Sequence, residues 1–591
     1  MNTIANRLEA LREIMRENRV DAWIVTGSDP HSSEYVAQRW LTRAWITGFT
    51  GSAGTVVVTA DRALLWVDSR YFIQAEQQLE GSPFDLQKID TPQVVDYVQW
   101  LSNTMKEGCR IGFDGTTMTL SAKRTIERAF IGRRFEVVAT DDWFDLIWTD
   151  RPAPPHEPVT TLSERYAGLT CSEKIDIIRK SFQRLGCTHH LVASLDDIAW
   201  ILNARGSDIT YNPVFLAYLL IGPQNAILCI DADRVETGLK EQLSKDVEIV
   251  SYEDIKKVLQ KIPAQNSTIY FSPDKVSTAL FQAFPTGVGT VEGRDISTDL
   301  KAAKHVKELE GMRRAHLLDG LALVRFLSHL AASKHVYDEI TLAEKLVWFR
   351  KKSDEYIGPS FSPIAGFCGH GALAHYAATP ETASVLDTDG LLVLDTGAQY
   401  TCGTTDVTRT LLFGAPSDEM TRDYTLVLKG NLSLASQRFP KGTTGYQLDI
   451  LARQHLWQHG QNYGHGTGHG LGFCLNVHEG PQNISPRPLV VPLISGMVLS
   501  DEPGIYKKDR YGIRLENIIT VVEDGETEFG SFLAFEVLTM CPFERKLIDT
   551  SLLSDAEIHM VNTYHTWVRD ELDPYLDEAE RTWLAQATAA L

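Results

Sequence analysis

Cysteines are scarce in this sequence, and their scarcity argues against two classes of protein. Only eight occur among 591 residues, and none forms a Cys-x-x-Cys pair. A small secreted domain held by disulfides and a zinc site built from thiolates both need more cysteines at closer spacing. We therefore expect reduced cysteines, as in a cytoplasmic protein, and we interpret Cys368, Cys402 and Cys474 as packing residues.

Basic charge and long apolar runs are also scarce. Lys and Arg number 57 against 77 Asp and Glu, which gives a net charge of −20. Binding to a nucleic-acid backbone depends on basic patches, so we expect no nucleic-acid partner. No apolar run is long enough to span a membrane, and residues 5–19 mix charged residues with leucines at helical spacing. We therefore expect neither a membrane partner nor an export signal.

The length and the alternation of elements predict several domains. At roughly 150 residues per domain, the chain has room for three or four. Short apolar strands at 22–26, 54–59 and 63–68 alternate with helical segments, which favours an α/β domain over residues 1–150. Residues 150–158 contain four prolines, which favour extended backbone. We interpret residues 151–158 as an interdomain linker.

A second α/β domain is predicted over residues 159–302. A helix is expected at 172–185, a short helix at 195–203, and strands at 190–194, 214–221 and 225–230. Its scale and alternation resemble those of the first domain, which suggests a duplication, although no repeat of residues proves it.

The third domain is predicted over residues 303–545. It opens with an amphipathic helix at 305–330, followed by a second helix at 341–352. Strands dominate from residue 363 to 541, interrupted by helices near 418–439 and 447–459. A helical tail at 546–591 follows, and Ser554-Asp-Ala-Glu557 is the capping box that opens its helix.

The third domain concentrates Asp, Glu and His in apolar or glycine-rich surroundings. Asp395 ends an apolar run, and the chain then turns and returns through Asp406. A hairpin would bring both carboxylates to one face, where they repel unless a proton or a metal ion lies between them. Taken alone, the two aspartates fit two interpretations about equally well, a paired site of this kind and two ordinary surface residues in turns.

Histidines and glutamates complete the set. Gly-His465-Gly-Thr-Gly-His469-Gly places two histidines among glycines, and His478 follows. Glu502 ends an apolar strand, and Glu516 is predicted inside the strand 511–522. Four carboxylates balance the charge of two divalent cations, and oxygen-rich ligation with one imidazole suits Mn²⁺ or Co²⁺ better than a thiolate-type zinc site. Other histidines (His31, His316, His455 and His559) are interpreted as surface or satisfied core residues.

The order Asp395, Asp406, His469, Glu502, Glu516 resembles the ligand signature of the pita-bread metallopeptidases. His375-Tyr376, the motifs around His465 and His478, Glu502-Pro-Gly-Ile-Tyr and Gly-Ile-Arg514-Leu-Glu516-Asn are similar to the proline-peptidase branch. Ile46-Thr-Gly-Phe-Thr-Gly-Ser-Ala-Gly54 in the first domain and Asp196-Asp-Ile-Ala-Trp200 in the second extend the likeness over nearly the whole chain. Ala378-Thr379 departs from the pattern, since many relatives carry proline or asparagine nearby.

The resemblance implies a fold and an activity. It implies two α/β domains of the creatinase/prolidase N-terminal type and an α+β pita-bread C-terminal catalytic domain. About 300 residues before the catalytic domain match the long, three-domain aminopeptidase P form. The implied activity is that of a metal-dependent aminopeptidase that hydrolyses the N-terminal Xaa-Pro bond of peptides with a water or hydroxide bridging two divalent ions. A homodimer in the cytoplasm is implied as well.

The resemblance also assigns roles. Asp406 and Glu516 bridge both ions, Asp395 holds one, and His469 and Glu502 hold the other. The ions are expected to be Mn²⁺, with Co²⁺ or Zn²⁺ as alternatives. Glu502 acts as the general base. His375, His465 and His478 place the substrate and move protons or stabilise the tetrahedral intermediate. Arg514 orients the carboxylates of the metal site.

Three other readings stay open. A prolidase would act only on Xaa-Pro dipeptides, and the domain count argues against it. A pita-bread fold retained as a binding module would not need all five ligand positions filled. A creatinase-like amidine hydrolase shares the fold but should not need this full metal set.

Overall fold

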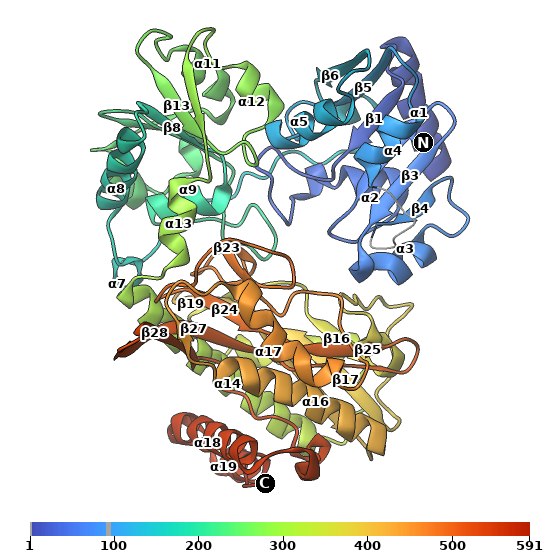
Figure 1. The fold of residues 1–591 in the computed structure, drawn as a ribbon, viewed down its shortest axis with the longest axis vertical. Helices are drawn as coiled ribbons and strands as arrows, with labels where there is room; N and C mark the ends of the chain where they lie inside the picture. The colour runs from blue at the N-terminus through green and yellow to red at the C-terminus, as the bar shows by residue number, and fades with distance from the viewer. Residues whose placement is uncertain (1–2, 90–95) are drawn as a thin grey trace. The chain divides into compact units, whose positions relative to one another are not determined.

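The computed structural model describes residues 3–89 and 96–591. The chain divides into two compact units, residues 1–162 with 169–298, and residues 163–168 with 299–591 (Figure 1). The first unit contains both predicted α/β domains, and the second contains the candidate ligands. None of the helices in the described part of the chain is long and apolar enough to cross a membrane.

The first unit opens with a six-stranded sheet in the order β4-β3-β2-β1-β5-β6. β1 pairs antiparallel with β2 and parallel with β5, so apolar strands lie at the centre of the sheet. The strands are β1 (Ala22–Val25), β2 (Thr55–Thr59), β3 (Ala63–Val67), β4 (Asp85–Lys88), β5 (Cys109–Asp114) and β6 (Phe135–Thr140). The helices around them are α1 (Ile4–Glu17), α2 (Thr42–Thr47), α3 (Phe72–Gln78), α4 (Tyr97–Thr104), α5 (Leu120–Ala129) and α6 (Phe144–Ile147).

A second six-stranded sheet repeats this arrangement in the order β12-β11-β10-β8-β13-β14. Each strand also pairs in the same direction as its counterpart, with β8 antiparallel to β10 and parallel to β13. The suggested duplication is therefore visible in the topology. The strands are β8 (His189–Val192), β10 (Tyr218–Ile221), β11 (Ala226–Cys229), β12 (Val247–Val250), β13 (Thr268–Phe271) and β14 (Gly289–Glu292). The longest helix of this part is α8 (Cys171–Arg184), and α9 (Leu195–Leu202) follows β8.

The segment between the two sheets has no regular secondary structure over residues 151–158. It is nevertheless held in place, because the buried Arg151 side chain pairs with Asp142 and Asp145, both at 2.7 Å. The domain boundaries given by the sequence remain predictions.

The second unit is built from long helices and antiparallel strands. Its helices are α14 (Val306–Ala332), α15 (Glu339–Arg350), α16 (Asp418–Ala435), α17 (Gly445–Trp457), α18 (Asp555–Leu572) and α19 (Glu578–Ala587). The predicted capping box is present at the start of α18, where Ser554 and Glu557 bond to each other's backbone amides. Figure 1 shows α16 and α17 beside each other, and α18 and α19 near the C-terminus.

Two antiparallel sheets of the second unit carry the candidate ligands. One has the order β16-β17-β20, from β16 (Ile364–Phe367), β17 (Gly390–Thr396) and β20 (Val407–Phe413). The other has the order β21-β28-β27-β24-β22-β23, and its members nearest the site are β22 (Gly468–Gly470), β24 (Val498–Asp501) and β27 (Asn517–Thr527). A separate two-stranded pair, β25 (Gly504–Lys507) with β26 (Tyr511–Arg514), lies between β24 and β27 in the sequence.

The strand predicted at 511–522 is in fact two strands. β26 ends at Arg514 and β27 begins at Asn517, and the two belong to different sheets. Leu515 and Glu516 form the break. Glu516 therefore lies between two sheets, and the prediction of a residue inside one continuous strand was wrong.

A buried ion pair fixes the end of β17. Arg350 is fully buried and donates to Asp319 at 2.7 and 3.1 Å, to Thr396 at 2.5 Å and to the Gly397 carbonyl at 3.0 Å. Asp319 also accepts from the Tyr400 hydroxyl at 3.0 Å. A buried charge is tolerated only when it is paired and fully hydrogen-bonded, so each partner depends on the other.

Asp319→Ala is expected to lower the free energy of unfolding by about 3–5 kcal/mol, because it leaves the Arg350 guanidinium buried without its counter-ion. The measurement is urea unfolding followed by fluorescence. Glu536→Ala is the control, since the Glu536–Arg313 pair is exposed and should contribute less than about 1 kcal/mol. Equal effects of the two substitutions would contradict this account.

Candidate metal centre

Strand register brings the two aspartates together. β17 and β20 are antiparallel, and Asp395 lies opposite Thr408. Asp406 directly precedes β20, two residues before Thr408, and so lies at the end of the pair where Asp395 stands. The predicted hairpin is present, with two short strands, β18 (Ala398–Tyr400) and β19 (Gly403–Thr404), between its arms.

The two glutamates meet at the end of another antiparallel pair. β24 and β27 pair with Asp501 opposite Asn517, so the next position along this register holds Glu502 and Glu516. Backbone hydrogen bonds fix both residues, from the Glu502 amide to the Thr467 carbonyl at 2.8 Å and from the Glu516 amide to the Thr408 carbonyl at 3.0 Å. The second bond joins the sheet that carries the aspartates to the sheet that carries the glutamates.

His469, on β22, completes the cluster. Its Nε2 atom lies 3.4 Å from an Asp406 oxygen and 3.6 Å from a Glu502 oxygen. Ligand atoms of Asp406, His469 and Glu516 all lie within 4.8 Å of one another. The Nδ1 atom of His469 donates to the Gly470 carbonyl at 2.9 Å, which leaves Nε2 directed at the carboxylates.

The cluster is closed on one side and open on the other. Asp395, Asp406 and Glu516 are buried, at 9%, 4% and 1% exposure. The side chains of His469 and Glu502 keep 21% and 19%. A reacting molecule would therefore reach the cluster past His469 and Glu502.

The buried carboxylates repel one another, and their pKa values record it. Burial raises the pKa of Glu516 well above its usual range, and the charges of Asp406, Glu502 and Asp395 add to the effect. Burial likewise raises the pKa of Glu502 to about 7. Burial alone would lower the pKa of His469, but the Asp406 hydrogen bond and the Glu502 and Asp406 charges raise it to about 9. Without cations, this cluster would hold extra protons near neutral pH.

Hydrogen bonds satisfy only part of the cluster. Thr408 donates to Glu516 at 2.7 Å, and Ser500 donates to Glu502 at 3.2 Å. The Oδ1 atoms of Asp395 and Asp406 are buried and have no hydrogen-bond partner. Unpaired buried carboxylate oxygens are costly, and a divalent cation would satisfy both at once. The donor set therefore fits hard divalent ions.

Arg514 contacts one of the candidate carboxylates, and its orienting role stays a prediction. The buried guanidinium donates to Asp395 at 2.6 Å, to Thr408 at 3.2 Å and to the Tyr506 hydroxyl at 2.7 Å. The Tyr506 hydroxyl in turn donates to Nε2 of His465 at 2.7 Å. Tyr506 was not assigned a role from the sequence, although it stands within the Glu502-Pro-Gly-Ile-Tyr motif.

The three other histidines occupy different environments. His465 has both ring nitrogens engaged, since Nδ1 donates to the Gly466 carbonyl at 2.7 Å. Burial and the Arg514 charge lower its pKa to about 3, with a smaller contribution from His375, so its imidazole is neutral at neutral pH. The His478 ring meets the His469 ring edge-on, with centroids 4.3 Å apart. His375 and His478 are both partly exposed.

Three of the four other histidines named from the sequence are hydrogen-bonded or exposed, whereas the buried Nε2 atom of His316 has no hydrogen-bond partner. His31 is buried between the Ala193 carbonyl at 2.8 Å and the Tyr252 hydroxyl at 2.9 Å. His316 bonds to the Met312 carbonyl, His455 contacts Ser433, and His559 is exposed. All eight cysteines are free, and Cys402 and Cys474 are buried.

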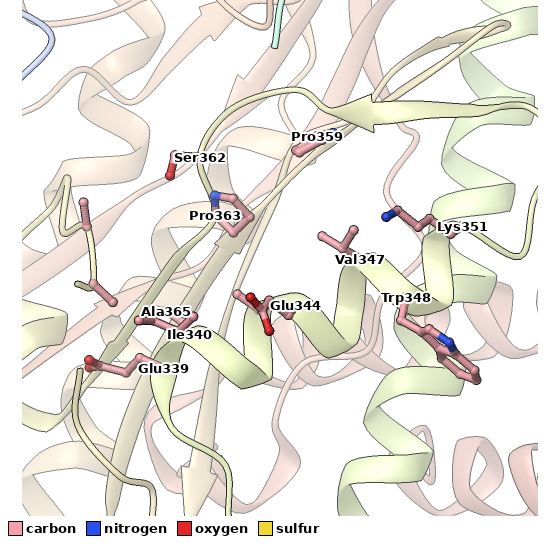
Figure 2. Close-up of a pocket in the computed structure, with 13 residues that line it drawn as sticks. Glu339, Ile340, Glu344, Val347, Trp348, Lys351, Pro359, Ser362, Pro363 and Ala365 are labelled. Carbon is pink, nitrogen blue, oxygen red and sulfur yellow. The ribbon is translucent and has the colours of Figure 1, made fainter. Parts of the chain in front are cut away.

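A separate cavity of about 550 Å³ lies against α15, and Figure 2 shows its lining. None of the candidate ligands lines it. Its walls come from α15, the segment 359–365 and Ala377–Ala378, and they are mainly apolar.

Comparison with protein families matches all parts of the chain. The model of metallopeptidase family M24 matches residues 310–523, and that of the C-terminal region of the same peptidases matches 531–591. Two models of the creatinase/prolidase N-terminal domain match residues 7–147 and 150–308. The expected fold class is thereby confirmed.

Individual relatives match over nearly full length. A probable Xaa-Pro aminopeptidase P of Aspergillus fumigatus is 40% identical over 605 positions, covering 99% of this chain and 92% of that protein. The crystal structure of the X-prolyl aminopeptidase of Caenorhabditis elegans, a cytosolic enzyme with a di-nuclear active site, superposes with a TM-score of 0.96 at 35% identity, covering 100% of both chains. The Xaa-Pro dipeptidase of Bacillus anthracis has a TM-score of 0.52 at 25% identity and covers 64% of this chain.

The full-length matches carry both N-terminal domains, whereas the dipeptidase matches only part of the chain. The chain therefore belongs to metallopeptidase family M24, in the three-domain form of the Xaa-Pro aminopeptidases P.

Proposed function

We propose that this chain is an aminopeptidase that removes the first residue from peptides with proline at the second position, using two divalent metal ions. The observation that carries the proposal is the group of four carboxylates and one imidazole around a single partly open space. The full-length likeness to Xaa-Pro aminopeptidases supports the substrate class.

The five predicted ligands would hold the ions. Asp395, Asp406, Glu502 and Glu516 would supply carboxylate ligands to the two ions, and His469 would supply the imidazole. The unpartnered Oδ1 atoms of Asp395 and Asp406 support this assignment. When bound, two such ions lower the pKa of water and stabilise charge developing on the attacked carbonyl. Oxygen-rich ligation favours Mn²⁺, with Co²⁺ or Zn²⁺ as alternatives.

Five residues of the chain have separate roles in the proposed reaction. Glu502, at the open side, takes the proton of the attacking water. Arg514 holds Asp395 in place through its hydrogen bond. His375 and His478, both partly exposed, place the substrate and stabilise the tetrahedral intermediate. His465 is neutral and engaged at both nitrogens, which favours a positioning role over proton transfer.

A dedicated enzyme is needed because proline alters the scissile bond. The imide nitrogen before proline carries no N–H, and the ring fixes φ, so clefts that bind extended peptides accept it poorly. A prolidase restricted to dipeptides is the alternative, and the two N-terminal domains argue against it.

Location and assembly are further proposals. We infer a cytoplasmic homodimer without nucleic-acid or membrane partners. The free cysteines support a cytoplasmic location, and the net charge of −20 argues against a nucleic-acid partner. For the dimer, α17 presents Tyr446, Ile450 and Trp457 at 41–50% exposure, at a spacing that puts all three on one face. A second copy of the chain is the partner that would cover them.

After chelation, the protein should cleave no peptide, and Mn²⁺ should restore release of the first residue from an Xaa-Pro-Xaa tripeptide. An Xaa-Ala-Xaa tripeptide should remain intact, since it lacks the imide bond. Product release is measured by chromatography, with metal content from mass spectrometry. Cleavage confined to an Xaa-Pro dipeptide would identify a prolidase, and no cleavage with any divalent ion would refute the proposal.

Tyr506→Phe is expected to reduce kcat/KM for the tripeptide by about 10- to 100-fold, because it removes the hydroxyl that links Arg514 to His465. The variant should still bind two metal ions, since Tyr506 is not among the ligands. Tyr575→Phe, at an exposed tyrosine near the C-terminus, serves as the control. Unchanged kinetics of the Tyr506 variant would show that this link is dispensable.

Trp457→Glu is expected to shift the protein from dimer to monomer, because it places a charge on the apolar face of α17, at the C-terminal end of the helix. Sedimentation velocity over a range of concentrations measures the change. Trp348→Glu, at an equally exposed tryptophan on α15, is the matched control. A wild-type monomer, or a dimer unaffected by Trp457→Glu, would contradict this interface.

A further inference from the structure

The segment between β16 and β17, which carries His375, is long and almost without regular structure. It spans residues 368–389, and its one helical turn covers Cys368–Ala372. A segment of this length cannot satisfy its backbone groups through a sheet ladder, so it needs polar anchors. Two backbone hydrogen bonds hold its far end, from the Glu339 amide to the Ser384 carbonyl at 3.2 Å and from the Leu386 amide to the Tyr337 carbonyl at 2.9 Å. The side-chain anchor is one carboxylate from another element.

Glu339, the first residue of α15, accepts hydrogen bonds from several parts of this segment. Its carboxylate is buried, and Oε1 accepts from the Phe367 amide at 2.7 Å and from Nδ1 of His370 at 2.9 Å. Oε2 accepts from the Tyr376 hydroxyl and from the Ser384 amide, both at 2.8 Å. Figure 2 shows Glu339 at the end of α15 next to Ile340.

The four donors span the whole segment. The Phe367 and Ser384 amides stand near its two ends, and His370 and Tyr376 lie between them. The His370 and Tyr376 rings also stack, with centroids 4.5 Å apart and an interplanar angle of 22°. One carboxylate therefore ties these four donors together and holds Tyr376, the residue that directly follows His375.

A carboxylate suits this place better than any uncharged side chain. Its two oxygens only accept hydrogen bonds, and all four neighbours can donate. The N-terminus of α15 also favours a negative charge. An amide in the same position would present an NH₂ group to two of the donors.

We infer that Glu339 is a positioning residue for His375. By holding Tyr376 and both ends of the segment, it keeps the His375 imidazole where the substrate enters. Because His375 directly precedes Tyr376, the hydrogen bond from the Tyr376 hydroxyl to Glu339 restrains the backbone that carries the His375 imidazole. The inference rests on the proposed function, in which His375 stabilises the tetrahedral intermediate.

The test compares Glu339→Gln with Glu344→Gln, an exposed glutamate one turn along the same helix that also borders the cavity. Glu339→Gln should lower kcat for the Xaa-Pro-Xaa tripeptide by about 10- to 100-fold with KM little changed, and its content of two metal ions should stay intact. Glu344→Gln should match the wild type. Tyr376→Phe, which removes one donor, should show a smaller loss and remains informative if Glu339→Gln does not fold.

A double-mutant cycle separates positioning from general stabilisation. In a His375→Ala background, Glu339→Gln should cause almost no further loss of kcat, because the group it positions is gone. An equal loss in both backgrounds would overturn the inference. So would wild-type kcat in both Glu339→Gln and Tyr376→Phe.

Hydrogen exchange provides a readout that does not depend on activity. In Glu339→Gln, peptides covering residues 367–384 should exchange faster than in the wild type, while peptides covering β17 and β20 should not. Unchanged exchange in 367–384 would overturn the inference. A wild type that cleaves no peptide, combined with the expected exchange, would refute the proposed function and leave the anchoring role of Glu339 standing.

Discussion

The mutual repulsion of four carboxylates, three of them buried, is the constraint on which the catalytic unit depends. Asp395, Asp406, Glu502 and Glu516 occupy one space, and burial raises the pKa of three of them, Asp395, Glu502 and Glu516. Hydrogen bonds from Thr408, Ser500 and Arg514 offset only part of this repulsion. Divalent cations remove the rest, because they supply positive charge where protons would otherwise bind. Folding of the site and metal binding are therefore coupled.

The approach of the two aspartates could be predicted from the sequence because a hairpin is a local pattern, whereas the ordered set of five ligands rests on the family resemblance. Asp395 lies on β17, and Asp406 directly precedes the neighbouring strand β20. The break at Leu515 and Glu516 was not predictable in this way. An apolar run continues through it, and only the pairing of β26 with β25 and of β27 with β24 separates the two strands.

Tyr506 and Glu339 show where sequence reasoning ends. The hydroxyl of Tyr506 links Arg514 to His465, and 41 positions separate Tyr506 from His465 in the sequence. Glu339 contacts residues 28 to 45 positions further along the chain. Neither contact follows a helical or strand period, and both arise from the path of irregular segments. The two sheets of the first unit are a further example. They share one strand order, but the sequence shows no repeat of residues from which that order could be predicted.

The catalytic unit holds its groups by two different means. The ligands stand at the ends of paired strands, where the backbone hydrogen bonds of Glu502 and Glu516 fix their positions. His375 lies instead on an irregular segment and depends on side-chain hydrogen bonds. Metal ligation requires fixed distances, which sheets provide. A group that meets the substrate must instead stand at an open edge, where no ladder is available, and one buried carboxylate supplies the rigidity that the missing strand would have given.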